Sequence, residues 1–249
     1  MDLFIKPEDE LQLGQTINAK IIDIDKIGIY NPEQFEFVDE NYLEKNKIRI
    51  LYNDFSTDGG HQTSATTCGC FGYGSDGYWY WLDTYYYSPH EKPRKKAPSE
   101  LSKDLFNFEM EMLKKWKCGI DKETIDSAEG ALRNQFFSDF GKTLHPVNKG
   151  KDKEELIDYS INFLSKGKLR VINNNNNKIV KKEIENYQWL EGSIEKGKPV
   201  PDKTEKEFTG GEEYFNTWSK EQSYYYAEHT CDLFQYWVKD NLRKLGLKE

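Results

Sequence analysis

The fold is decided by three stretches, KIRILYND at 47–54, ATTCGCFGY at 65–73 and YWYWLDTYYY at 78–87. Their Ile, Thr, Tyr and Trp residues favour strands, because branched and aromatic side chains pack well on a pleated surface. The sequences Asp58-Gly59-Gly60 and Gly74-Ser75-Asp76-Gly77 separate the stretches. Short turns of this kind join neighbouring antiparallel strands. The pattern therefore predicts an antiparallel meander of three strands.

Helices and strands alternate after the meander. A helix is expected between Ser99, as its cap, and Gly119, because apolar residues recur there at spacings of three and four. These residues are Leu101, Leu105, Phe108, Met112 and Trp116. Short strands are predicted at 122–127 and near Thr143-Leu144, with a helix of about ten residues between them.

The C-terminal part of the chain continues this alternation. A helix is predicted over 153–166. Strands at 168–173 and 178–184 are expected to form a hairpin across a run of asparagines. A final amphipathic helix is predicted over 219–246.

The chain divides at about residue 45. Residues 1–45 contain acidic runs and short apolar groups without a sustained period, as in a linker or the tail of a missing domain. Residues 46–249 hold the predicted strands and helices and can form one large domain. A meander followed by alternating helices and strands and a C-terminal helix is the element order of the ribonuclease H-like α/β fold. We therefore predict a mixed sheet, with an antiparallel three-strand meander plus parallel strands, flanked by helices.

Composition and charge argue against several classes of protein. No apolar stretch approaches the roughly 18 residues of a membrane span. The first residues lack the basic start and apolar core of a signal peptide, so the protein is expected to be soluble and intracellular. Its net charge of -8 disfavours indiscriminate binding to nucleic acids. Any contact with DNA must be local or helped by a partner.

The four cysteines, Cys68, Cys70, Cys118 and Cys231, are too few and too irregularly spaced for a disulfide framework. Cys68 and Cys70 could bind zinc together with His61, but both lie in a predicted strand and no second pair follows. Buried free thiols are the favoured interpretation.

Acidic residues mark three places where metal ligands could gather. Asp54 closes the first predicted strand, beside a glycine loop where a phosphate can approach the backbone. Asp126 ends a short strand, and Glu129 follows one turn later. His229 and Asp232 are three residues apart and therefore share one helix face. Carboxylates from two strand ends and one helix can hold a pair of divalent cations around a phosphate.

Each of these places also has an ordinary structural interpretation. An Asp at a strand end, such as Asp54, is often a turn former. Asp126 can cap the helix that follows it, and His229 with Asp232 can be a solvated pair. Taken one by one, the structural interpretations are favoured. The three acidic sites in this order favour a metal centre, so we interpret the chain as a metal-dependent nuclease.

Two apparent nucleotide-binding motifs fail in their context. Residues 72–77 match G-x-G-x-x-G, but a strand follows instead of the helix that a dinucleotide site requires, so we predict a hairpin turn. Gly141-Lys142-Thr143 imitates the end of a Walker A loop, but Phe136 stands where the first glycine belongs. The aromatic residues of 79–87 are expected to pack the core rather than to stack on bases or sugars.

Two basic segments flank the predicted catalytic strands. Arg94, Lys95 and Lys96 belong to a proline-containing loop, and a second group precedes the helix at 153–166. This second group consists of Lys142, Lys149, Lys151 and Lys153. Such charges are usually solvated, but at these positions they are candidates for contacts with DNA phosphates.

From Lys47 to Arg243 the chain resembles the C-terminal nuclease domain of the large terminase subunit of tailed bacteriophages. The motifs that carry the resemblance are Asp54, Ile125-Asp126-Ser127-Ala128-Glu129, the lysine segment 149–153, Glu183-x-x-x-Tyr187-x-Trp189 and His229-x-x-Asp232. The resemblance implies an endonuclease that cuts concatemeric duplex viral DNA during genome packaging, using two Mg2+ or Mn2+ ions. Asp54, Asp126 and Asp232 would be the metal ligands, with His229 beside the third and Glu129 as a further candidate. Around Asp54 the chain departs from the family, because Asp58-Gly59-Gly60-His61 replaces an aromatic-rich turn.

The resemblance also implies partners and a location. The partners would be double-stranded DNA, a packaging ATPase domain, the portal and the small terminase subunit. No membrane would be involved. Residues 1–45 would be the interdomain end next to the missing ATPase domain, and the protein would act on the procapsid in the host cytoplasm. Two alternatives stay open: a non-catalytic DNA-binding or assembly module of the same fold, and a resolvase-like or transposase-like nuclease. A requirement of DNA cleavage for metal would distinguish an enzyme from the non-catalytic module. The shape of the preferred DNA substrate would identify a resolvase-like or transposase-like nuclease.

Overall fold

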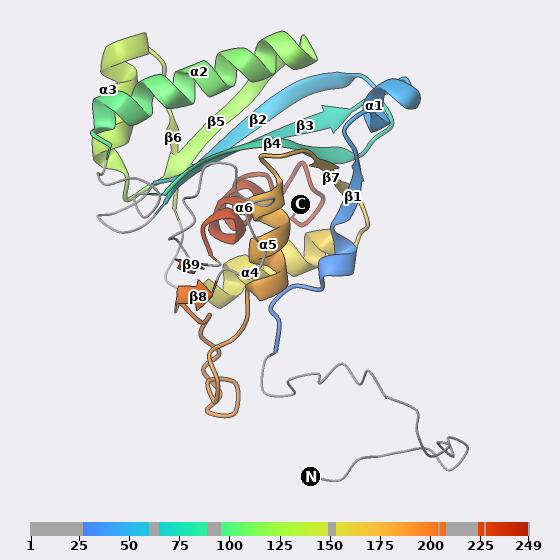
Figure 1. The fold of residues 1–249 in the computed structure, drawn as a ribbon, viewed down its shortest axis with the longest axis vertical. Helices are drawn as coiled ribbons and strands as arrows, with labels where there is room; N and C mark the ends of the chain where they lie inside the picture. Colours follow the sequence, from blue (N-terminus) through green and yellow to red (C-terminus); the bar gives the residue numbers. More distant parts are fainter. Residues whose placement is uncertain are drawn as a thin grey trace, which may run out of the picture.

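A seven-stranded mixed sheet, in the order β1-β7-β4-β3-β2-β5-β6, forms the centre of the molecule (Figure 1). The computed structural model describes residues 27–59, 65–88, 96–148, 153–203, 205–207, 224–226 and 228–248. The strands of the sheet are β1 Glu36–Asp39, β2 Ile50–Asp58, β3 Thr66–Gly74, β4 Trp79–Tyr87, β5 Gly119–Asp126, β6 His145–Val147 and β7 Leu169–Asn173. β2, β3 and β4 form an antiparallel meander, and the remaining pairings are parallel. The predicted mixed sheet is confirmed.

Helices cover both faces of this sheet (Figure 1). On one face lie α2 Pro98–Trp116 and α3 Gly130–Phe140, and on the other lie α4 Lys153–Leu164, α5 Lys178–Asn186 and α6 His229–Asp240. The smaller elements are η1 Pro32–Gln34, α1 Tyr42–Lys45 and the paired strands β8 Glu205–Glu207 and β9 Tyr224–Tyr226. Each face of the sheet has its own apolar core. None of the described helices is long and apolar enough to cross a membrane.

Aromatic side chains of the meander fill the core beneath α6. Phe71 of β3 stacks on Trp237 of α6, with ring centroids 4.3 Å apart. Trp81 of β4 stacks with Phe234 of α6 at 5.8 Å. Trp79 belongs to the same buried cluster. The prediction that the aromatic residues of β4 pack the core is confirmed for these two tryptophans.

Strand β2 presents different chemistry to the two faces. Phe55 packs edge-on against Phe108 of α2. Ser56 points the other way, and its hydroxyl donates to a backbone carbonyl of α6 at 3.3 Å. Side chains two positions apart share a face, so Asp54 and Asp58 both face α6. Asp58, the last residue of β2, therefore lies where this strand ends next to α6.

Two predictions about the meander and its cysteines are confirmed. Residues 75–78 form the turn between β3 and β4, in which Gly77 has a φ of 80° that favours glycine. Cys68, Cys70 and Cys231 are buried free thiols. Burial raises the pKa of Cys68 above its usual value, which makes its thiol inert.

The hairpin predicted after residue 168 is wrong in its second half. β7 ends at Asn173, but 178–186 forms the helix α5. Its buried residues Ile179, Val180, Glu183 and Ile184 repeat at the period of a helix. The partners of β7 are β1 and β4, and both pairings are parallel.

Two predicted helix starts also need correction. α2 begins at Pro98 after Ala97, not after a Ser99 cap, because proline is favoured in the first helical turn. The last helix, α6, begins at His229, since 224–226 forms the strand β9.

Part of the segment assigned to a linker belongs to the fold. β1 pairs in parallel with β7 at the edge of the sheet. Ile29, Tyr30 and Phe35 lie in the core on the α6 side, and the amide of Gln235 in α6 donates to the Tyr30 hydroxyl at 2.8 Å. Tyr30 and Phe35 pack against Phe234 of α6 but follow no regular period in the sequence, so the sequence pattern does not reveal them. The domain boundary predicted at residue 45 is therefore too late.

Candidate active site

The carboxyl ends of β2 and β5 bring two aspartates together. The strands are parallel neighbours, and their register pairs Thr57 with Ile125. Asp58 and Asp126 follow these two residues and end their strands side by side. Asp126 Oδ1 also accepts a hydrogen bond from the Ala128 N–H at 3.0 Å. Asp126 therefore shapes the turn before α3 as well as facing its neighbour.

The beginning of α6 adds a third carboxylate to this pair. Tyr236, one turn after Asp232, donates its hydroxyl to Asp232 Oδ2 at 3.5 Å. Burial raises the pKa of Tyr236, and the negative charges of Asp232, Asp58 and Asp126 raise it further. Because the charges of all three carboxylates act on this one hydroxyl, the three carboxylates lie in the neighbourhood of Tyr236.

Two lysines supply positive charge to these carboxylates. Lys153, the first residue of α4, donates its ammonium to Asp232 Oδ1 at 2.5 Å. Lys203 lies close enough for its charge to act on Asp232, and Asp58 acts on Lys203 in turn. Burial alone would raise the pKa of Asp232, but Lys153 and then Lys203 outweigh it and hold this pKa below its usual value. Lys153, a candidate for phosphate contact from its position in the sequence, thus binds a carboxylate in this structure.

Glu129 reaches the same edge of the sheet from the start of α3. A Cβ atom built on Gly59 would lie 2.7 Å from Glu129 Oε2 and closer still to its Cγ and Cδ atoms. The Glu129 side chain therefore rests directly on the backbone that follows Asp58. Only a residue without a side chain leaves room for this contact.

His229 is buried behind Asp58, with 4% of its surface exposed. Its Nδ1 lies 3.9 Å from Asp58 Oδ2, and its Nε2 accepts the Ala65 N–H at 3.4 Å. Burial would lower the pKa of His229, but the hydrogen bond to Asp58 and the charges of Glu183 and Asp58 raise it above the usual value. This geometry makes His229 a support for Asp58 rather than an exposed ligand.

Asp54 does not end a strand, so the premise for placing it in the metal site is wrong. β2 continues through Phe55-Ser56-Thr57 and ends at Asp58, and four strand residues span about 13 Å. Asp54 lies 3.3 Å from the Lys244 ammonium. Burial raises the pKa of Asp54 to about 6, although Lys244 opposes this shift. The sequence signal for Asp58 is the stretch Asp58-Gly59-Gly60, which begins where the strand pattern stops.

The region of the chain that matches a protein-family model includes Asp58, Asp126 and Asp232. Residues 58–240 match the family model described as the terminase RNAseH like domain. The chain belongs to this family. The predicted ribonuclease H-like fold and the resemblance to terminase nuclease domains are confirmed. Family and fold together support a terminase nuclease-type function.

Solved structures of large terminases share the fold of this terminase domain. The large terminase of a thermophilic bacteriophage has a TM-score of 0.65 and 20% identity, with 88% of this chain and 45% of that chain covered. The nuclease domain of g2p, the large terminase of bacteriophage SPP1, was solved with bound Mn; it has a TM-score of 0.53 and 13% identity, with 84% and 97% covered. The chain thus spans less than half the length of the thermophilic phage protein. No curated protein sequence matches the chain.

The donor set of this terminase domain suits a hard divalent cation. Asp58, Asp126 and Asp232 offer carboxylate oxygens, the ligands that Mg2+ and Mn2+ prefer. Among the described residues, no three His, Cys, Asp or Glu side chains stand in a ready-made cluster around one point. The hydrogen bond from Lys153 occupies Asp232 Oδ1, one of the oxygens that could bind a cation. A cation that took Asp232 Oδ1 as a ligand would displace the Lys153 ammonium from it.

Most residues predicted to contact DNA lie outside the described part of the chain. These are Arg94, Lys95, Lys149 and Lys151. Lys96 forms an ion pair with Asp104 and lies over the Tyr87 ring at 4.1 Å. Lys142 bonds with the buried Glu109 and Glu123 on the α2 side of the sheet, so its charge is committed to the fold.

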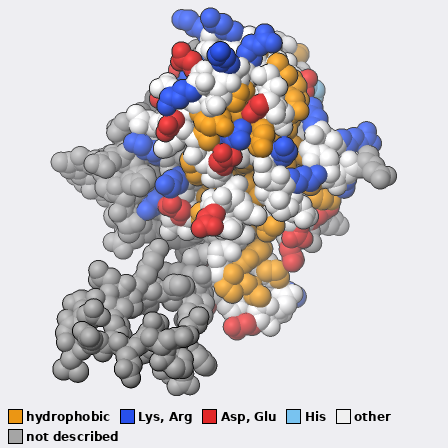
Figure 2. Space-filling view, turned by 90° about the vertical axis from the view of Figure 1, so that its right-hand side faces the viewer, with side chains coloured by type: hydrophobic (Ala, Val, Ile, Leu, Met, Phe, Trp, Pro, Cys, Tyr) orange, Lys and Arg blue, Asp and Glu red, His pale blue; other side chains and the backbone are white. Residues whose placement is uncertain are grey.

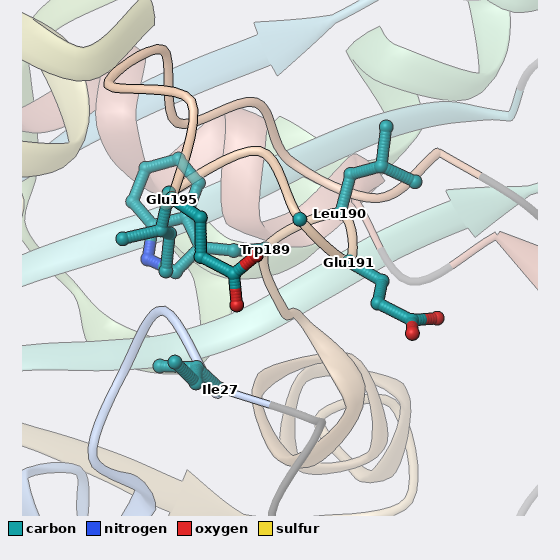
Figure 3. A pocket seen from close by; sticks show the side chains of 7 residues that line it. Ile27, Trp189, Leu190, Glu191 and Glu195 are labelled. Atoms are coloured by element: carbon teal, nitrogen blue, oxygen red, sulfur yellow. The ribbon is translucent and has the colours of Figure 1, made fainter.

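A separate hollow of about 570 Å3 lies between Ile27 and residues 189–195 (Figure 3). Trp189 and Leu190 contribute apolar walls, and Glu191 and Glu195 lie beside them. None of the three clustered aspartates lines it. We assign it no part in the chemistry of the site.

Gly59→Ala is expected to lower DNA cleavage about tenfold, the scale of changes that disturb the support of a metal site. The added methyl group must push Glu129 away from Asp58, which costs little stability because the Glu129 side chain can swing outward. Plasmid cleavage and the thermal unfolding midpoint should be compared with those of Gly130→Ala, whose methyl group meets nothing within 4 Å. Equal cleavage by the two variants would remove Glu129 from the site.

Proposed function

We propose that this chain is a divalent-metal-dependent endonuclease that cuts concatemeric duplex viral DNA during genome packaging. The observation that carries the proposal is that Asp58 and Asp126 end the neighbouring strands β2 and β5, with Asp232 nearby in the first turn of α6. Membership of the terminase RNAseH like family supports it. The manganese in the SPP1 nuclease domain supports the type of cofactor.

The chemistry assigned to the site is hydrolysis of a phosphodiester. Two Mg2+ or Mn2+ ions would lower the pKa of an attacking water and stabilise the leaving 3′ oxygen. Asp58, which ends β2 beside Asp126, would be a metal ligand in place of Asp54. Asp126 and Asp232 would be further metal ligands, and Glu129 is an additional candidate. His229 orients Asp58 through its Nδ1 side.

The proposed partners are duplex DNA and the remaining parts of a packaging machine: the ATPase domain, the portal and the small terminase subunit. The proposed location is the host cytoplasm, at the procapsid. On the face drawn in Figure 2, basic and acidic side chains are interspersed rather than separated. With a net charge of -8, this distribution favours weak DNA binding by the isolated chain, which an assembled machine would strengthen through local concentration.

Cleavage of supercoiled plasmid by the purified chain tests the proposal. We expect nicked and linear products with Mn2+ or Mg2+, and none with a chelator, because carboxylates alone do not generate hydroxide near neutral pH. Restoring the metal after chelation should restore cleavage. Products that form equally well in chelator would contradict the proposal.

A non-catalytic DNA-binding or assembly module is the second candidate function. The observation that favours it is the ion pair between Lys153 and Asp232, since a lysine can balance the carboxylates without a cation. Such a module would bind DNA equally with and without Mn2+ and would cut neither linear nor supercoiled substrate. Preferential cutting of branched junctions over plain duplex would instead identify a resolvase-like enzyme.

A further inference from the structure

A carboxylate with no exposed surface lies behind the proposed site. Glu183 of α5 is 0% exposed. Its Oε2 accepts two hydrogen bonds from Thr230 of α6, from the backbone N–H at 2.5 Å and from the hydroxyl at 2.6 Å. Its Oε1 is buried and has no hydrogen-bond partner among the described residues. Burying a charged group in this way is unfavourable unless its interactions offset the loss of water.

Glu183 takes the place of a local cap for α6. The residue before the helix, Glu228, makes no side-chain hydrogen bond to the first turn. The free N–H groups of a helix start need acceptors, and a negative charge there is favoured by the helix dipole. Because the acceptor comes from another helix, the position of the first turn of α6 is tied to α5.

That first turn carries two residues of the proposed site. His229 precedes Thr230, and Asp232 follows it by two positions. The charge of Glu183 also acts on His229 and raises its pKa. A shift of Thr230 would therefore move His229 away from Asp58 and Asp232 away from the other carboxylates.

We propose that Glu183 is a positioning residue for the metal site: its two hydrogen bonds to Thr230 hold the start of α6 so that Asp232 and His229 face Asp58 and Asp126. This inference rests on the proposed nuclease function. Glu183 touches neither metal nor DNA. It acts through Thr230, as groups behind metal ligands do when they hold those ligands in place.

Mn2+ binding to the folded protein, measured by the electron paramagnetic resonance signal of free Mn2+, is the primary test. Glu183→Ala should weaken Mn2+ binding at least tenfold. Glu183→Gln, which keeps an acceptor oxygen but not the charge, should fall between Glu183→Ala and the wild type. The matched control is Glu185→Gln, an exposed position of the same helix, which should bind Mn2+ as the wild type does.

Cleavage kinetics distinguish positioning from a general loss of structure. The half-saturating Mn2+ concentration should rise in Glu183→Ala, while the rate at saturating Mn2+ recovers to within a few fold of the wild type. Should Glu183→Ala fail to fold, Thr230→Val gives the same test, because it removes the hydroxyl hydrogen bond but preserves the shape and the N–H. Its loss of Mn2+ affinity should be smaller than that of Glu183→Ala.

Two results would overturn the inference, and they differ from failure of the proposed function. Wild-type Mn2+ affinity in folded Glu183→Ala or Thr230→Val, with the wild type binding Mn2+ and cutting DNA, overturns the positioning role alone. A rate loss in these variants that excess Mn2+ does not restore overturns it as well. A wild-type chain that neither binds Mn2+ nor cuts DNA overturns the proposed function and, with it, this inference.

Discussion

Asp58→Asn is expected to reduce metal-dependent cleavage about a thousandfold, the scale on which loss of a group that stabilises transition-state charge is felt. Asp58 ends β2 beside Asp126 and faces α6. The substitution removes a negative charge from the centre of the cluster but keeps the size of the side chain. The fold should therefore survive, and the loss should lie in metal binding and rate.

Asp54→Asn is the matched control for this experiment. Asp54 lies on the same strand and the same face as Asp58. Its carboxylate forms an ion pair with Lys244 and is not grouped with Asp126 and Asp232. Its cleavage should stay within a few fold of the wild type. If Asp54→Asn is the inactive variant and Asp58→Asn cuts normally, the first ligand has been assigned to the wrong aspartate.

The pH dependence of stability gives the Asp54 control a second readout. Burial raises the pKa of Asp54 to about 6, so the folded state holds this proton more tightly than the unfolded chain does. Its contribution to stability is therefore present at low pH and is lost as pH rises from about 4 to 6. Asp54→Asn removes this loss, so above pH 6 the variant should be no less stable than the wild type in denaturant titrations.

The comparison of Asp54 with Asp58 shows what the sequence pattern can and cannot locate. Periodicity and turn residues predict the meander, β5 and α2 well, because each has a strong local signal, but they start the last helix well before its observed beginning at His229. They do not say where β2 stops, since Phe55-Ser56-Thr57 fits a strand as well as a loop. The two aspartates also share a face, so a pattern of exposed and buried positions does not separate them.

Residues that act across the fold were harder to predict than those within one element. Glu183 falls in a stretch predicted as a strand, and only its place on α5 brings it to Thr230. The sequence shows Lys153 as a basic residue, but its contact with Asp232 joins residues that are 79 positions apart. Neither contact has a local signature in the chain. Asp126, His229 and Asp232 have a local signal, because a strand end marks Asp126 and a spacing of three residues places His229 and Asp232 on one helix face.

The ion pair between Lys153 and Asp232 predicts a large stability effect that depends on metal. With a chelator present, Lys153→Met should lower the free energy of unfolding by about 3 kcal/mol, because it leaves the buried Asp232 carboxylate without its partner. Because the pKa of Asp232 is lowered in the folded state, the ion pair stabilises the fold at pH values above the usual pKa of an aspartate. This stabilisation is lost in acid. The measurement should therefore be made near pH 7.5. The control is Lys45→Met, which breaks a solvent-exposed pair with Asp39 and should change stability little.

A double-mutant cycle of Lys153→Met and Asp232→Asn shows whether a cation replaces the lysine. With a chelator, the coupling energy should be about 2 kcal/mol, within the range for side chains in direct contact. With Mn2+, the coupling should fall towards zero, because the cation takes over the charge of Asp232 and releases Lys153. For the same reason, Mn2+ should stabilise Lys153→Met more than the wild type, where it must first displace the ammonium group. A coupling energy that is equal in chelator and in Mn2+ would mean that Asp232 keeps its lysine and is not a metal ligand.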